Sequence, residues 1–307
     1  MSNQATPTPP AISFLIPAYN EGASIRETIQ RLEALCTEHS LRYEIIVIDD
    51  GSSDETAANA RATPTENLTV IQHPTNRGYG RALKTGLYAA TYDWCAIVDA
   101  DGSYPIESFP DLLRHVPAFD MVVGARTGKN YWGSLGKRLG RLVLIQMVAF
   151  VIGVRIPDPN SGMRVFRKDI ALEHVKRISS GFSFTVTITL AMFLDERTVQ
   201  YVPIEYLDRV GDSKVKIGVD SLRVIQILAQ AILYYNPLKL FLVLCFFSAG
   251  VGTLLGVVAM LFGAWGLGLG LLAIGLQAAI LLGGMGFLAE AIRLHRIGAV
   301  AIPQREE

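Results

Sequence analysis

The sequence has few cysteines and no net charge, and each shortage excludes a class of protein. The 3 cysteines, Cys36, Cys95 and Cys245, lie far apart, which supports neither a disulfide framework nor a zinc site and fits a reducing, cytosolic setting. The 28 Lys and Arg residues balance 28 Asp and Glu residues, so no overall field marks the chain as a nucleic-acid binder. No G-x-G-x-x-G motif follows the apolar run at residues 12–16, which argues against a dinucleotide-binding dehydrogenase.

Charge is missing altogether from residues 240–289, which contain no Lys, Arg, Asp or Glu. Because about 20 apolar residues cross a bilayer, this stretch predicts two membrane-spanning helices, with the turn between them at the Gly-rich residues 264–268. A buried hairpin of a soluble protein is the alternative, but the run is longer than ordinary core helices. Basic residues flank the run and are absent from the turn, so the positive-inside rule places both flanks and the N-terminal domain in the cytosol, at a bacterial inner membrane or an equivalent. These flanking residues are Lys239, Arg293, His295 and Arg296.

The domain boundaries follow from composition. Residues 1–10 are polar and rich in Pro and Thr, without the apolar segment of a signal peptide, and predict a disordered leader. We expect the main domain at 11–217, an amphipathic interface helix at 218–236, the transmembrane hairpin at 237–296 and a cytosolic tail at 297–307.

Short apolar runs alternate with amphipathic stretches as far as about residue 125. The runs predict strands at 12–16, 43–48, 68–71, 94–98 and 121–123, and the stretches predict helices at 23–38, 54–61, 79–91 and 108–116. This alternation is typical of βαβ units, so we expect an α/β fold with a mostly parallel sheet flanked by helices. Ligands of such sheets bind at the carboxyl ends of the strands.

Two further helices are expected near the membrane. Residues 134–152 carry Lys137, Arg138 and Arg141 at the start and an apolar second half, and residues 218–235 are amphipathic. Such helices lie in the membrane interface or pack in a core. The first leaves both possibilities open, whereas the position of the second beside a span favours the interface.

Acidic residues follow three of the expected strands. Asp99 and Asp101 are separated by one residue, a spacing at which two carboxylates hold a hard divalent cation together with substrate phosphates, although acidic turns are common. Asp49 and Asp50 precede a tight glycine turn, where a single acid would suffice to cap the next helix. A carboxylate there can accept hydrogen bonds from a nucleotide base or ribose. Tyr19, after the first strand, either stacks on a base or packs locally.

These motifs resemble those of a known family. Pro-Ala-Tyr-Asn-Glu at 17–21, Asp-Asp-Gly-Ser-Ser-Asp at 49–54 and Asp-Ala-Asp-Gly-Ser at 99–103 resemble the family 2 glycosyltransferases, which have the Rossmann-like GT-A fold. Asp-Pro-Asn-Ser-Gly-Met-Arg-Val-Phe-Arg at 158–167 is similar to the acceptor loop of dolichyl-phosphate mannose synthase-like enzymes, and 209–214 to their R-x-G-x-S-K segment. The resemblance covers roughly residues 11–220.

The resemblance implies an enzyme that transfers a hexose from a GDP- or UDP-linked sugar to a polyprenyl phosphate, dolichyl or undecaprenyl phosphate, at the bilayer. It implies a nucleotide site at Pro17, Ala18, Tyr19, Glu21, one or both of Asp49 and Asp50, and Asp99. Asp99 and Asp101 would bind Mg²⁺ or Mn²⁺. A grip on the lipid phosphate or the donor diphosphate would come from Arg126, Ser161, Arg164, Arg209 and Lys214, with Arg138 as a further phosphate contact. Because Ser103 stands where many relatives have a metal-binding Gln, a third protein ligand is in doubt, and Thr185 and Thr187 replace the acids that follow G-x-x-F in some relatives.

A phosphate acceptor also shapes the expected mechanism. It is already anionic at neutral pH, so no general base is required, and in-line attack predicts inversion at the anomeric carbon. One alternative is a family 2 enzyme with a hydroxyl acceptor on a glycolipid or polysaccharide; the Q-x-x-R-W motif of processive synthases is absent. Another is a catalytically silent membrane scaffold, which would not preserve the acidic pair and the basic segment. Gly252-x-x-x-Gly256 can pack either the two spans or two chains, so the oligomeric state stays open.

Overall fold

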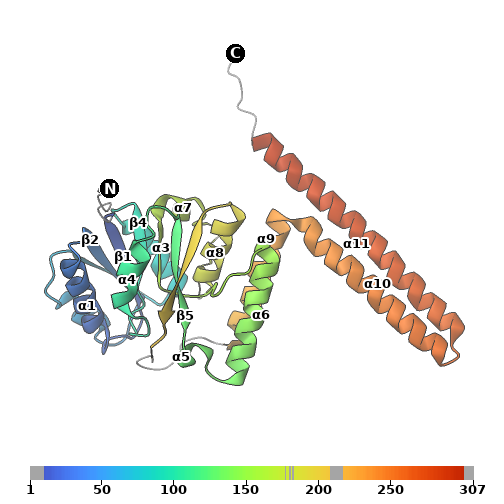
Figure 1. The fold of residues 1–307 in the computed structure, drawn as a ribbon, viewed down its shortest axis with the longest axis horizontal. Helices are drawn as coiled ribbons and strands as arrows, with labels where there is room; N and C mark the ends of the chain where they lie inside the picture. Colours follow the sequence, from blue (N-terminus) through green and yellow to red (C-terminus); the bar gives the residue numbers. More distant parts are fainter. Residues whose placement is uncertain (1–9, 177, 180, 182, 208–216, 301–307) are drawn as a thin grey trace, which may run out of the picture. The chain divides into compact units, whose positions relative to one another are not determined.

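The computed structural model describes residues 10–176, 178–179, 181, 183–207 and 217–300. The chain divides into two compact units, Met1–Val224 and Ile225–Glu307. The predicted leader therefore lies almost wholly outside the described residues. Figure 1 shows the sheet-containing first unit and the helical hairpin of the second.

The first unit is built on a seven-stranded sheet with the strand order β3-β2-β1-β4-β6-β5-β7. Neighbouring strands run parallel except β6, which is antiparallel to both β4 and β5. The strands are β1 Ile12–Ala18, β2 Tyr43–Asp49, β3 Leu68–Gln72, β4 Trp94–Ile97, β5 Met121–Thr127, β6 Arg164–Arg167 and β7 Val199–Glu205.

Helices cover both faces of the sheet (Figure 1). Alternate side chains of a strand point to opposite faces, so Phe14 and Ile16 of β1 belong to a core that includes side chains of α1 and α4, whereas Leu15 belongs to a second core with α3, α7 and α8. Because both faces are covered, every residue of β1 is buried, and its sequence is a continuous run and not an alternation. The helices of this unit are α1 Ile25–Glu38, α2 Thr56–Arg61, α3 Tyr79–Ala89, η1 Ile106–Ser108, α4 Phe109–Leu113, α5 Lys129–Trp132, α6 Leu135–Ile152, α7 Lys168–Glu173 and α8 Phe184–Leu194, and α9 Ile217–Tyr235 contains the boundary between the two units.

The predicted α/β class with a mostly parallel sheet is confirmed, and all five predicted strands are present as β1 to β5. Strands β6 and β7 were not predicted. β6 has only four residues, of which Arg164 and Arg167 are charged, and β7 contains Gln200, Pro203 and Glu205, so neither shows a strand-like apolar pattern. Their places in the sheet come from pairing with distant strands.

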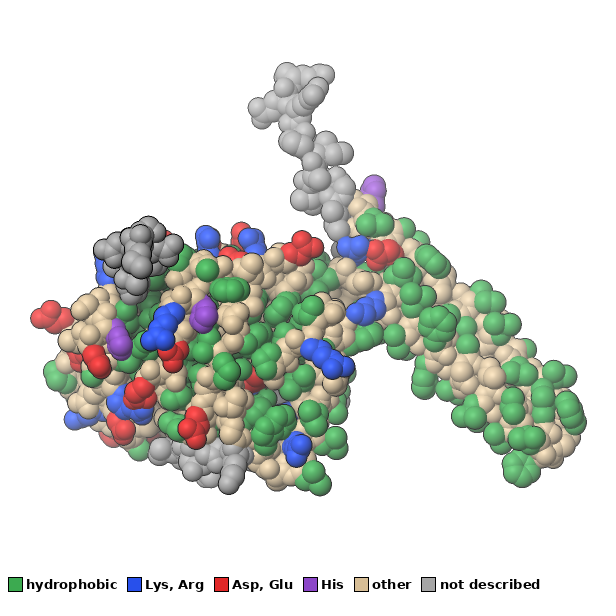
Figure 2. Space-filling view, viewed as in Figure 1, with side chains coloured by type: hydrophobic (Ala, Val, Ile, Leu, Met, Phe, Trp, Pro, Cys, Tyr) green, Lys and Arg blue, Asp and Glu red, His purple; other side chains and the backbone are tan. Residues whose placement is uncertain are grey.

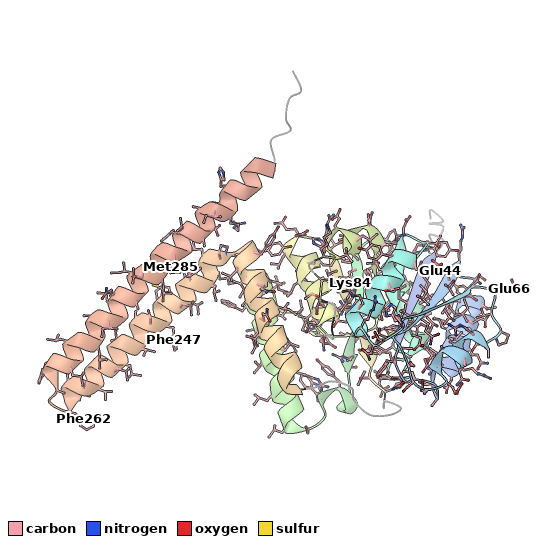
Figure 3. The ribbon with its side chains drawn as sticks, turned by 180° about the vertical axis from the view of Figure 1, so that it is seen from behind. Glu44, Glu66, Lys84, Phe247, Phe262 and Met285 are labelled. Atoms are coloured by element: carbon pink, nitrogen blue, oxygen red, sulfur yellow. The ribbon has the colours of Figure 1, made fainter. Side chains whose placement is uncertain are left out.

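The second unit is a pair of long apolar helices, α10 Pro237–Leu261 and α11 Trp265–Val300, which confirms the predicted hairpin. Both are long and apolar enough to cross a membrane, over Pro237–Leu261 and Trp265–His295. Phe247, Phe262 and Met285 point away from the hairpin (Figure 3). On the face shown in Figure 2, hydrophobic side chains are spread along the hairpin, and charged ones gather near the end opposite the turn between α10 and α11.

Glycines hold the two long helices together. A Cβ on Gly252 would lie 2.6 Å from the Cα of Gly275, and a Cβ on Gly256 would lie 2.8 Å from the carbonyl oxygen of Gly268. The Gly252-x-x-x-Gly256 pair therefore packs the two spans of one chain against each other, which is one of the two roles expected of that motif.

The predicted turn at 264–268 was placed too far along the chain. The helices are separated only by residues 262–264, where Gly263 has φ +81°. Gly268 lies inside α11 because its missing side chain is needed for close helix packing and not for a turn.

Candidate active site

The sequence motifs meet at one edge of the sheet. The parallel strands β3, β2, β1 and β4 end there side by side, with Ala18 of β1 paired to Asp49 of β2. Because β6 is antiparallel to β4 and β5, its first residue, Arg164, pairs with Ile97 at the end of β4 and with Val123 of β5, which continues four residues further to Thr127. The residues after β5 and the segment before β6 therefore reach the same edge as Asp99.

The loops after β1 and β2 are joined to each other. The Asn20 backbone N–H donates to Ser52 Oγ (2.9 Å), and Asn20 Oδ1 accepts from the Ser53 N–H (2.9 Å). The Glu21 N–H donates to Thr56 Oγ1 (2.8 Å). Asn20 has φ +53°, a conformation that Asn adopts more readily than most residues. The Pro-Ala-Tyr-Asn-Glu and Asp-Asp-Gly-Ser motifs thus form one loop cluster, with Pro17 and Ala18 buried beneath it and Tyr19 and Glu21 half-buried in it.

Asp49 combines complete burial with an unused hydrogen-bond acceptor. Its Oδ1 accepts from both the N–H (3.1 Å) and the hydroxyl of Ser52, whereas Oδ2 has no hydrogen-bond partner in the described part of the chain. An open pocket of about 340 Å³ adjoins this turn and is lined by Gly51, Ser52, Gln72, His73 and Pro74. A buried acceptor without a partner is costly, so this carboxylate suits a ligand that brings an N–H or O–H group.

Asp50, the adjacent acid, is already engaged by the protein. It lies 2.7 Å from His73 Nδ1 and accepts the backbone N–H groups of Arg77 and Gly78, the latter at 2.7 Å. His73 Nε2 in turn lies 3.0 Å from Thr85 Oγ1. Asp50 therefore anchors the loop between β3 and α3, and of the two adjacent acids only Asp49 keeps an unpartnered oxygen.

Hydroxyl groups hold the two acids of the D-x-D motif. Asp101 is buried, and its Oδ1 accepts from the N–H (3.0 Å) and the hydroxyl (2.5 Å) of Ser103. Asp99 accepts from the Tyr79 hydroxyl at 2.9 Å. Burial and the charge of Asp99 raise the pKa of Tyr79 well above its ordinary value, so Tyr79 remains a donor. The serine that stands where relatives have Gln thus supports Asp101.

The segment before β6 presses against this acidic pair. A Cβ on Gly162 would lie only 2.5 Å from Asp99 Oδ2, and the Gly162 N–H donates to the Tyr104 hydroxyl at 2.7 Å. Only glycine permits the backbone to approach Asp99 so closely.

A buried arginine-carboxylate pair lies at the end of β5. Arg126 Nε and Nη2 donate to the two oxygens of Asp158, at 2.7 and 3.0 Å. Burial disfavours the charged guanidinium, but Tyr104 and Asp158 outweigh it and raise the pKa of Arg126 well above its ordinary value. The guanidinium also lies over the rings of Tyr131 (5.1 Å) and Tyr206 (5.4 Å), which fixes its plane.

Ser161 and Arg164, expected to grip phosphate, are occupied inside the fold. The Ser161 hydroxyl donates to the carbonyl oxygen of Gly124 at 2.5 Å. The fully buried Arg164 guanidinium donates to the carbonyl oxygens of Ser161 and Thr185 and to Thr189 Oγ1. Burial lowers its pKa. These two side chains therefore support the segment before β6 and position Gly162 next to Asp99.

The other basic candidates are placed differently. Arg138 is exposed on α6, with its guanidinium 5.6 Å from the centroid of the Trp132 ring. Arg209 and Lys214 lie outside the described residues. The sequence did not single out Tyr79, Tyr104, Tyr131 or Tyr206, because an aromatic residue carries no motif and each acts through a partner from another element.

The donor chemistry of the acidic pair fits a hard divalent cation. Among the residues that the structure describes, no group of three or more His, Cys, Asp or Glu side chains is placed to hold a metal. Two carboxylates suit Mg²⁺ or Mn²⁺, which complete their shell with phosphate oxygens and water, and do not suit zinc, which takes three or four protein ligands.

Comparison with known proteins gives the same fold. Glucosyl-3-phosphoglycerate synthase from Mycobacterium tuberculosis, solved with Mn²⁺, uridine diphosphate and phosphoglyceric acid, superposes with a TM-score of 0.59 at 22% identity over 72% of this chain and 78% of that chain. This likeness concerns the fold.

Sequence relatives point to one enzyme class. The chain is 27% identical over 284 residues to an undecaprenyl-phosphate 4-deoxy-4-formamido-L-arabinose transferase of Pectobacterium carotovorum, covering 85% of this chain and 86% of that protein. It is 29% identical over 220 residues to a low-salt glycan biosynthesis hexosyltransferase of Haloferax volcanii, of which the match spans about half (52%), and 70% of this chain. Residues 13–174, more than half of the chain, match the family described as Glycosyl transferase family 2. The chain therefore belongs to family 2 of the glycosyltransferases.

Proposed function

We propose that this glycosyltransferase moves a hexose, with inversion, from a nucleotide-sugar to a polyprenyl phosphate at the cytosolic face of a membrane. One observation carries the proposal. An acidic pair suited to a metal-diphosphate and the buried Arg126–Asp158 pair lie at the same sheet edge of a chain that also has an apolar helical hairpin.

The donor would lie along the ends of β3, β2, β1 and β4. Neighbouring strands are about 4.8 Å apart, so the step from Asp49 on β2 to Asp99 after β4 is about 10 Å, which suits a nucleoside at one end and its diphosphate at the other. Asp49 Oδ2 would accept from the base or ribose, with Tyr19 and Glu21 beside it. Asp99 and Asp101 would hold the metal, which when bound neutralises charge on the diphosphate leaving group.

The acceptor would approach from the side of β5 and α6. Arg126 offers a planar, fixed guanidinium, the group best matched to phosphate, and the 208–216 segment with Arg209 and Lys214 follows β7, which pairs in parallel with β5. Because the acceptor phosphate is already ionised, the chain needs no general base, and its contribution is to hold two anions in line.

Exposed apolar residues support membrane attachment. In the first unit, α6 exposes Leu135 (82%), Leu139 (64%) and Val143 (50%) on a helix that also carries Arg138, whereas Val148 is buried. An apolar stripe with arginine beside it suits the interface between headgroups and acyl chains, so we assign α6 to the interface. The uncharged turn between the spans supports cytosolic flanks.

A transfer assay tests the proposal. The purified full-length protein in phosphatidylcholine nanodiscs would be incubated with labelled nucleotide-sugars, undecaprenyl or dolichyl phosphate, and Mn²⁺, Mg²⁺ or EDTA. We expect an organic-extractable product with one donor, lost in EDTA, whose anomeric configuration is inverted. A product found only in the aqueous phase would refute the lipid acceptor and favour a hydroxyl acceptor. Retention of configuration would refute the in-line mechanism, and no donor binding at all would indicate a silent scaffold.

A further inference from the structure

Arg141 on α6 is a partly buried cation without a counter-ion in the described part of the chain. Its guanidinium lies 4.5 Å from the centroid of the Tyr131 ring, the same ring that Arg126 contacts. Its Nη1 is buried and makes no hydrogen bond. Burial and the charge of Arg126 lower the pKa of Arg141.

The local charges do not balance among the described residues. Arg126 and Arg141 share one aromatic ring, but the only carboxylate that the described part of the chain pairs with either of them is Asp158, and both of its oxygens are taken by Arg126. Asp158 also accepts the N–H of Asn160 at 3.1 Å. A buried guanidinium nitrogen without an acceptor is unfavourable, so this cluster favours an additional anion, and a phosphate matches the planar donor group best.

The surroundings of Arg141 indicate which phosphate this is. The acids suited to the donor diphosphate lie after β4, whereas Arg126 lies on β5, beyond β6 in the sheet order. Leu139 and Leu142, close to Arg141 on α6, are exposed apolar side chains. A phosphate at Arg141 that carries a hydrocarbon chain would find apolar surface immediately beside it, which a donor diphosphate does not need.

We propose that Arg141, held against Tyr131, binds the phosphate monoester of the acceptor next to Arg126. It supplies a positive charge that no carboxylate of the described residues pairs with, whereas the charge of Arg126 is balanced by Asp158. The proposal rests on the function proposed above and deepens it. It assigns this role to Arg141, which the motifs did not mark, in place of Arg138, whose guanidinium lies over Trp132 at the exposed surface.

Steady-state kinetics in neutral phosphatidylcholine nanodiscs test the role of Arg141. For Arg141→Gln we expect the KM for undecaprenyl phosphate to rise about 10-fold or more, with the donor KM and the melting temperature close to wild type, since a charge-assisted hydrogen bond to phosphate is lost. Arg141→Lys keeps the charge without the planar stack and should fall between the two. Arg155→Gln is the matched control, because it removes the same charge from an exposed position just after α6 and should leave both KM values unchanged.

Several results would overturn the inference. An acceptor KM for Arg141→Gln within twofold of wild type would do so, as would a rise in the donor KM alone. A defect that arises only when anionic phospholipid is added would assign Arg141 to lipid headgroups. Citronellyl phosphate, a short water-soluble ester, provides a second test, since its affinity should fall in Arg141→Gln without any bilayer. Wild-type transfer in the same assay tests the proposed function separately, so failure of the variant test alone sinks only the role of Arg141.

Discussion

Replacing Gly162 by alanine should damage the acidic pair without unfolding the protein. The new Cβ would lie 2.5 Å from Asp99 Oδ2, 3.2 Å from Asp99 Cγ and 3.3 Å from Tyr104 Cε2. Asp99 cannot simply rotate, because its Oδ1 is held by the Tyr79 hydroxyl at 2.9 Å. Relieving the contact moves the carboxylate by about 1 Å, and a misplacement of that size costs about 100-fold in rate. We therefore expect kcat to fall about 100-fold and the Mn²⁺ concentration for half-maximal activity to rise.

The matched control is Gly140→Ala. A Cβ there meets nothing within 4 Å, and the position is exposed on α6, so activity should be unchanged and the helix slightly stabilised. Both variants would be assayed for sugar transfer across a Mn²⁺ titration, with thermal unfolding measured alongside. A Gly162→Ala enzyme with the kcat and metal requirement of wild type would refute the placement of Asp99 as a metal ligand pressed by this loop.

Three further predictions concern the nucleotide pocket, the hairpin and the topology. Asp49→Asn should raise the donor KM about 10-fold with little loss of stability. Asp50→Asn should instead lower the melting temperature, because an amide cannot accept all the hydrogen bonds that the Asp50 carboxylate accepts. Thermal unfolding and donor titrations that gave the reverse pattern would contradict our assignment. Gly252→Leu should separate α10 from α11 and lower the yield of folded protein in detergent. Gly283→Leu should not, because a Cβ at Gly283 meets nothing within 4 Å. Equal yields of the two variants on size-exclusion chromatography would argue against close packing of α10 and α11 at Gly252. Ala264→Cys should react with a membrane-impermeant maleimide added outside intact cells. Cys36 and Cys95 should not react, because burial raises the pKa of each thiol to about 12. Labelling of Ala264→Cys only after lysis would overturn the assignment of the hairpin flanks and the N-terminal domain to the cytosol.

The sequence predicted the class of fold because local patterns encode it. Continuous apolar runs mark buried parallel strands, and the charge-free stretch marks the hairpin, without knowledge of any contact. The two strands that were not predicted, β6 and β7, owe their place in the sheet to contacts with distant residues. Arg164 of β6, for example, is stable in the core only because the carbonyl oxygens of Ser161 and Thr185 accept its hydrogen bonds. The local sequence around Arg164 does not contain Thr185, which lies on α8.

The same limit separates residues that look alike in the sequence. Asp49 and Asp50 are adjacent and identical, yet His73 and the loop after β3 occupy only Asp50, which leaves the unpartnered oxygen on Asp49. Arg138 and Arg141 lie one helical turn apart, yet only Arg141 reaches the ring that Arg126 contacts. Motifs therefore identify the chemistry of this edge of the sheet. Which of two similar residues can bind a ligand depends on whether its polar atoms already have hydrogen-bond partners within the fold. If that reasoning is correct, activity should depend more on Asp49 and Arg141, each of which has a buried polar atom without a hydrogen-bond partner in the described part of the chain, than on Arg138, which is exposed.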